Sequence, residues 1–113
     1  MDYTERLRCL AINDTRLAED WIGAARVKSE ALDPKALALV RLAALIAVGG
    51  AVPSFGAEAD AALSAGVTAA EIVEVLIGVI PVVGLPRVVA AAPLLAVALG
   101  YDADDALEPQ SGG

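Results

Sequence analysis

Few side chains in this chain are able to do chemistry. Glu58 lies one helical turn after Ser54, so the two could face one pocket as an acid–base group and a hydrogen-bond donor. A carboxyl group in an apolar pocket suits proton transfer, because desolvation raises its pKa. The structural alternative makes Ser54 a helix N-cap and Glu58 a solvated residue of the first turn.

Other polar candidates interrupt the apolar part of the chain. Arg41 lies inside the segment LALVRLAALIAV, where a charge is costly unless paired, and its guanidinium suits a substrate carboxylate. An ion pair with Glu71 or Glu74, or a side chain that reaches solvent, would explain it without a ligand. Glu74 and Arg87 flank the most apolar stretch. They could lie at a pocket or at a subunit interface, or they could form a structural salt bridge. Trp21 would line a ligand pocket or anchor the core.

Composition excludes several classes of function. The 113 residues contain no histidine and one cysteine, Cys9, so no intramolecular disulfide and no cysteine-type metal site is possible. The residues Gly49-Gly50 follow a predicted helix, whereas a phosphate-binding loop precedes a helix, because the phosphate binds at the helix N-terminus. We therefore expect no cofactor and no metal. The net charge of −7 argues against nucleic acid and against an anionic membrane surface.

The apolar content is high for so short a chain. Hydrophobic residues make up 58% of it, and a small domain has too little interior to hide them all. The uncharged stretches 75–86 and 88–101 fall short of the roughly 20 residues that span a bilayer. The charged start MDYTERLR lacks the apolar core of a secretory signal. We therefore expect a cytoplasmic protein whose excess apolar surface faces copies of itself rather than a membrane.

The pattern predicts an all-α fold of about six helices, because no segment alternates with period two and Ala and Leu abound. Capping signals are Asp2 with Glu5, Asp33 before Pro34, and Thr68 with Glu71. Pro81 to Pro86 should form a corner, and Pro93 should kink or break the last helix. The expected helices run from Asp2 to Asn13, Thr15 to Glu30, Pro34 to Val48, Pro53 to Gly66, Thr68 to Ile80 and Pro86 to Leu99.

These helices predict one domain over residues 1–101. The acidic, Gly- and Ser-containing residues 102–113 have almost nothing to bury and should form a mobile tail. The last two helices are apolar on nearly every side, apart from Glu74, and a helix of that kind is buried on every side. A monomer of this size cannot easily surround both, so the sequence predicts a homo-oligomer with a shared core.

Two segments resemble a known family. The segment LDPKALALVRLAALIAVGG and, after a short helix, AALSAGVTAAEIVEVLIGVIPVVGLPR are similar to the carboxymuconolactone decarboxylase-like superfamily, which includes alkylhydroperoxidase D-like proteins. The resemblance covers about residues 32–99. It implies an all-helical fold with a central apolar helical hairpin that forms the core of a homo-oligomer, with a trimer or hexamer expected here.

The resemblance also implies where the family's chemistry would lie. Counting back from Gly66 places the Cys-x-x-Cys pair of the redox branch on Ala51 and Ser54, and its histidine on Glu58. A glutamate of the redox proton relay would fall on Leu39. None of the four is retained, which argues against a dithiol peroxidase, since that reaction needs a thiolate and a resolving thiol.

Two interpretations of function follow. The first is a non-redox or catalytically divergent family member that binds a small molecule or a protein partner. The second is a lyase or decarboxylase that acts on a small organic acid or lactone. Glu58 would then be its acid–base group, with Ser54 and Arg41 as its other polar groups and Glu74, Arg87 and Trp21 as further binding candidates. The sequence does not decide whether the chain is an enzyme.

Overall fold

The computed structural model describes residues 2–14 and 31–101. Contacts divide the chain into two units, Met1–Glu30 and Ala31–Gly113. In the first unit, helix α1 covers Tyr3–Ala11, and the Asp2 carboxylate caps it by accepting a hydrogen bond from the Glu5 N–H at 2.8 Å. Cys9 is buried. The helix expected from Thr15 to Glu30, with Trp21, lies outside the described residues.

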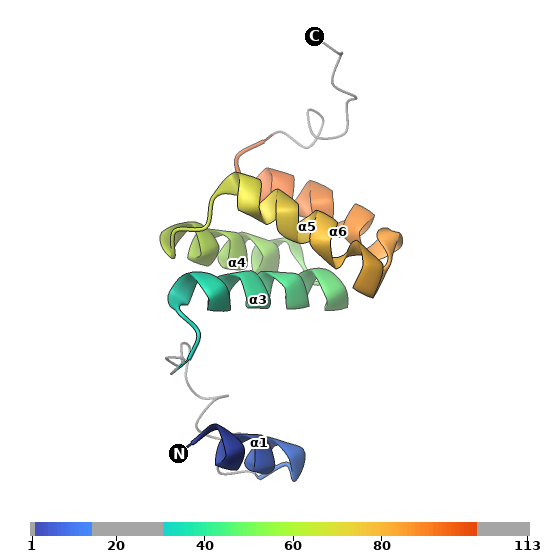
Figure 1. Ribbon diagram of the computed structural model, residues 1–113. Coiled ribbons are helices and arrows are strands. Elements are labelled where there is room, and N and C mark those ends of the chain that lie inside the picture. The colour runs from blue at the N-terminus through green and yellow to red at the C-terminus, as the bar shows by residue number, and fades with distance from the viewer. Residues whose placement is uncertain (1, 15–30, 102–113) are drawn as a thin grey trace. The chain divides into compact units, whose positions relative to one another are not determined.

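The second unit contains two helical hairpins. Helices α3 (Pro34–Val48) and α4 (Val52–Ser64) form the first hairpin, and α5 (Ala69–Val83) and α6 (Leu85–Ala98) form the second. The second hairpin packs across the first, so α3 contacts the three other helices and α4 contacts α6 as well as α3 (Figure 1). Every regular element in the described residues is a helix, which confirms the all-α prediction.

The core lies between the two hairpins. Its largest fully buried side chains come from all four helices, so each hairpin depends on the other to exclude water. No polar or charged side chain is buried among the described residues. The largest fully buried side chains are Phe55, Leu42, Ile46, Ile72 and Leu95.

The helix ends follow the expected capping chemistry. Asp33 accepts a hydrogen bond from the Ala36 N–H at 2.7 Å, and Pro34 fills the first helical position of α3. Thr68 and Glu71 form the predicted capping box at the start of α5, with hydrogen bonds of 3.0 and 3.1 Å. These side chains satisfy N–H groups that the helix itself leaves without partners.

The chain turns within the corner predicted from Pro81 to Pro86, but the predicted extent is wrong. Helix α5 continues through Pro81 to Val83, and Gly84 alone separates it from α6. Proline removes one N–H, but Ile80 and Val83 pack against the core, and this burial favours the helix more than the lost bond opposes it. Pro93 likewise does not break α6, which runs unbroken from Leu85 to Ala98.

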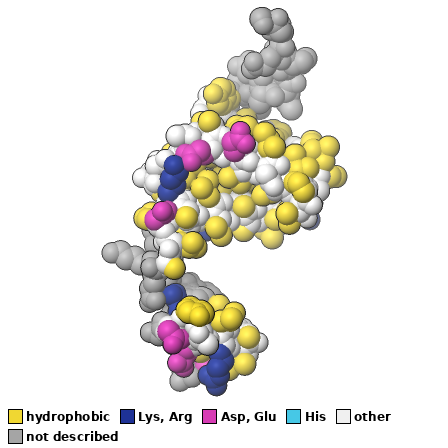
Figure 2. Space-filling model, in the orientation of Figure 1, with side chains coloured by type: hydrophobic (Ala, Val, Ile, Leu, Met, Phe, Trp, Pro, Cys, Tyr) yellow, Lys and Arg dark blue, Asp and Glu magenta, His cyan; other side chains and the backbone are white. Residues whose placement is uncertain are grey.

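Helices α5 and α6 also carry apolar side chains on the side away from the core. We call the exposed set Val73, Ile77, Val82, Leu85, Val89 and Val97 the outer hairpin face. In Figure 2, hydrophobic side chains gather at the right of the view, over the turn between α5 and α6. No helix in the described residues is long and apolar enough to cross a membrane.

Candidate functional site

The start of α4 is the position where the resemblance places redox chemistry. Ala51 is the N-cap, with extended backbone and no side-chain cap, and Ser54 is the third helical residue. The interpretation of Ser54 as the N-cap is therefore wrong. Pro53 lacks an N–H and has a fixed φ, which suits the first helical turn, so the helix begins before Ser54, at Val52. The Ser54 side chain is exposed.

Arg41 lies on α3, and Ser54 and Glu58 lie on α4, the two helices of the first hairpin. A Cβ atom added to Gly50 would lie 2.9 Å from Leu45 Cδ1 and 3.6 Å from Ser54 Cβ, so Leu45 and Ser54 border the same turn. Arg41 precedes Leu45 by one helical turn, and Glu58 follows Ser54 by one turn. Arg41 is exposed and Glu58 is half-buried. The first hairpin therefore carries a guanidinium on α3 and a hydroxyl and a carboxylate on α4.

Arg87 joins the second hairpin to the end of the first. Its Nη1 donates a long hydrogen bond, 3.4 Å, to the carbonyl oxygen of Val48 in the last turn of α3. A cation is favourable there because the free carbonyl groups make a helix C-terminus electronegative. Gly49 follows with φ +80°, and a Cβ atom at Gly49 would lie 3.1 Å from Arg87 Nη1. Glycine at this position leaves room for the guanidinium.

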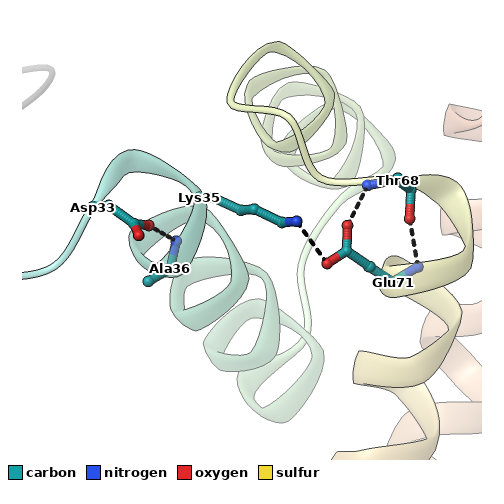
Figure 3. A network of polar contacts seen from close by, with 5 residues as sticks. All are labelled: Asp33, Lys35, Ala36, Thr68 and Glu71. Carbon is teal, nitrogen blue, oxygen red and sulfur yellow. Dashed lines mark hydrogen bonds and ion pairs between the residues drawn. The ribbon is translucent and has the colours of Figure 1, made fainter.

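The best-formed polar network in the described residues is structural. Lys35 Nζ, near the start of α3, lies 2.9 Å from Glu71 Oε2, and the other oxygen of Glu71 accepts from the Thr68 N–H (Figure 3). The hydrogen bond from Lys35, followed by that from the Thr68 backbone, lowers the pKa of Glu71 from its ordinary value of 4.5. The network connects the starts of α3 and α5.

Arg41 and Glu74 form no ion pair with any described residue, and Glu71, the other expected partner of Arg41, pairs with Lys35 instead. Glu74 is exposed on α5, and no salt bridge joins it to Arg87 within the described residues. Lys35 has a role that the sequence did not reveal, because its partner Glu71 is distant in sequence and meets it only when the hairpins pack.

An apolar groove of about 430 Å³ lies between α5 and α6, toward the end of the hairpin away from Gly84. Exposed side chains of Val73 and Val89 border it, and Tyr101 supplies the one hydroxyl group. The groove was not predicted, because the all-round apolar pattern does not say which side chains leave a gap. The remaining lining residues are Leu76, Ala92, Pro93, Leu95, Ala96 and Leu99.

The described residues thus form helices only, with two stacked hairpins in the second unit and an apolar outer face on the second of these hairpins. The model of the carboxymuconolactone decarboxylase family matches residues 15–97. This match spans most of the 113 residues, and the chain belongs to that family. Searches of the curated proteins and of the solved structures found no significant match to the chain.

Proposed function

We propose that this chain is a homo-oligomeric, non-redox member of the carboxymuconolactone decarboxylase family that binds a small molecule or a protein partner rather than reducing peroxides. The observation that carries the proposal is the outer hairpin face. The side chains of Ile77, Leu85 and Val89 are 55%, 56% and 60% exposed, on helices whose other side is fully buried. Apolar surface of this extent is stabilised by contact with another protein surface.

The absence of redox chemistry rests on the residues at the start of α4. Ala51 and Ser54 carry no thiol, and the chain's one cysteine, Cys9, is buried on α1. A buried thiol is shielded from solvent, and the chain holds no second cysteine to resolve it. The proposed protein therefore has no dithiol–disulfide cycle of its own.

Native mass spectrometry with a denatured control tests the proposal directly. We expect a defined oligomer, a trimer or hexamer, under native conditions. The variant Ile77→Glu places a charge in the outer hairpin face and should dissociate that oligomer while circular dichroism stays unchanged, because the side chain is outside the core. Arg41→Glu, on the first hairpin, is the matched control and should leave the assembly intact. A monomeric wild-type protein would contradict the proposal.

A lyase acting on a small organic acid is the second candidate. It is favoured by the half-buried position of Glu58 and by Arg41 on the other helix of the same hairpin, where a guanidinium would hold a substrate carboxylate. In this case Glu58→Gln should abolish turnover of the acid or lactone and leave assembly unchanged. Equal turnover by Glu58→Gln and wild type would eliminate this candidate.

A further inference from the structure

We propose that the apolar groove between α5 and α6 binds a small organic cation, an apolar molecule that ends in a primary ammonium group. This inference rests on the proposed function and names the class of its small molecule. It is carried by the size of the groove, by a backbone acceptor that Pro93 leaves without its helical donor, by the placement of Tyr101 and by the charge around the groove.

The groove has the size and the apolar surface of a small-molecule site. Its volume of about 430 Å³ falls within the range of roughly 300–1,000 Å³ that is typical of ligand pockets. The short side chains of Ala92 and Ala96 leave space between the two helices. Leu76 and Leu95, which also belong to the core, supply apolar surface. An aromatic ring or a chain of several carbon atoms is therefore stabilised when it leaves water for this groove.

A backbone acceptor lies at the wall of the groove. Proline has no N–H, so Pro93 cannot donate to the carbonyl oxygen of Val89, four residues before it in α6. Both residues line the groove, and Val89 is exposed. A ligand that displaces water from this oxygen must donate a hydrogen bond in return, because an acceptor buried without a donor is costly. The aliphatic side chains of the outer hairpin face contain no such donor, so a second copy of that face does not meet this requirement.

Tyr101 borders the groove, and a helix C-cap fixes its backbone. Gly100 has φ +92°, and its N–H donates to the carbonyl oxygen of Val97 at 3.0 Å. The Tyr101 N–H donates to the carbonyl oxygen of Ala96 at 2.9 Å. This pair of bonds is the Schellman motif, which favours glycine at the left-handed position and turns the chain back toward the groove. A tyrosine ring attracts a cation through its π-electrons, and its hydroxyl oxygen accepts a hydrogen bond from an ammonium group.

The charge around the groove favours a cation over an anion. None of the described residues that line it is charged, and no Lys or Arg follows Arg87 in the sequence. The guanidinium of Arg87 itself bonds to Val48, on the first hairpin. The acidic residues that follow Tyr101 in the sequence are Asp102, Asp104, Asp105 and Glu108. With a net charge of −7, the protein attracts an organic cation and repels a carboxylate of the same shape.

Three probes with one carbon skeleton test the ligand class. Phenylbutylamine, phenylbutanol and phenylbutyrate end in an ammonium, a hydroxyl and a carboxylate group at neutral pH. Isothermal titration calorimetry of the full chain should give the lowest dissociation constant for the amine, at least about tenfold below that of the carboxylate. The alcohol, which donates a hydrogen bond without a charge, should lie between them. Carboxylate binding as tight as that of the amine, or no saturable binding of the amine, would overturn the proposal.

Two proline substitutions test the acceptor. Pro93→Ala restores the N–H that pairs with the carbonyl oxygen of Val89, so it should raise the dissociation constant of the amine about tenfold. It should not weaken phenylbutyrate, which has no donor to lose, whereas a change in the shape of the groove alone would weaken all three probes. Pro81→Ala is the matched control, because it supplies an N–H to Ile77, which does not line the groove. An unchanged affinity of Pro93→Ala for the amine would refute the role of this carbonyl group.

Filling the groove tests the location. Ala96→Trp should abolish binding of the amine, whereas Ala90→Trp, at an exposed position on α6 outside the groove, should leave it unchanged. Should Ala96→Trp not fold, the proline pair decides, since neither of its members removes a core side chain.

The ligand class and the proposed oligomer can fail separately. A defined oligomer that binds no amine leaves the homo-oligomer standing and overturns the ligand class. A monomer that binds the amine contradicts the homo-oligomer and supports the ligand class. Binding by the Ile77→Glu variant but not by the wild type would show that a second copy occupies the groove, and it would overturn the proposal.

Discussion

The two hairpins of this protein both turn at a glycine, and they differ in the side chains that they expose. Each turns at a glycine with positive φ, Gly49 at +80° and Gly84 at +90°, and each buries one side in the common core. The first hairpin exposes Arg41 and Ser54 together with a few valines, whereas the second exposes valine, leucine and isoleucine over most of its outer face. The shared turn shows that glycine builds the hairpin, while the exposed residues determine what the hairpin contacts.

The largest loss of stability should come from substitutions in the core between the two hairpins. Leu42→Ala on α3 and Leu95→Ala on α6 remove side chains that are 0% and 1% exposed, and each should cost about 2–5 kcal/mol in the free energy of unfolding. Urea unfolding followed by circular dichroism measures this cost. A cost below about 1 kcal/mol for either residue would contradict a core formed equally by both hairpins.

Substitutions of exposed valines should distinguish the surfaces of the two hairpins. Val40→Ala on α3 should change the free energy of unfolding by no more than about 0.5 kcal/mol. Val89→Ala on α6, exposed to a similar extent, should weaken the oligomer on dilution because it removes part of the outer hairpin face. The same dilution behaviour for both variants would remove the distinction between the two surfaces.

The turns should be next in size. Gly49→Ala and Gly84→Ala force a side chain into a backbone region that is nearly restricted to glycine, at about 1–3 kcal/mol each. Gly49→Ala should cost more, because its Cβ atom would lie 3.1 Å from Arg87 Nη1. Thermal unfolding of both variants in an Arg87→Ala background checks this. Arg87→Ala should reduce the excess cost at Gly49 and leave the cost at Gly84 unchanged.

Substitutions at the N-termini of α4 and α5 should change the free energy of unfolding by a smaller amount. Thr68→Ala removes the cap of α5 and should lower stability by about 1 kcal/mol. Ala51→Ser supplies the cap that α4 lacks, at a residue that already has the extended backbone of an N-cap, and should raise stability by about 0.5–1 kcal/mol. Chemical unfolding of both variants measures the difference. Loss of stability in Ala51→Ser would mean that the start of α4 has another requirement.

The smallest effect on stability should appear at acidic pH. The hydrogen bond from Lys35 lowers the pKa of Glu71, so the folded state binds this proton less tightly than the unfolded chain does. The stabilisation is complete above the ordinary value of 4.5 and is lost as the pH falls through the lowered folded-state pKa. Lys35→Met should therefore flatten the dependence of the urea midpoint on pH below 4.5. An unchanged slope would show that the ion pair contributes nothing.

The sequence predicted local features well, because capping residues act within a few positions. Asp33 and the pair Thr68 and Glu71 took their expected roles. Where tertiary packing decides, prediction failed: buried neighbours carry α5 through Pro81, and the partner of Lys35 depends on how the hairpins stack. The candidate site was predicted as residue types on several helices, with Ser54 and Glu58 on one and Arg41 on another; the contact of Arg87 with Val48 could not be predicted, because it depends on how the hairpins pack.

The one-residue turn at Gly84 has a kinetic consequence. Because α5 and α6 are adjacent in sequence, closing this hairpin costs little chain entropy, and local contacts of this kind favour fast folding. The outer hairpin face is then complete before any second copy arrives. Refolding should therefore show a rapid step that is independent of protein concentration, followed by a slower association step whose rate rises with concentration.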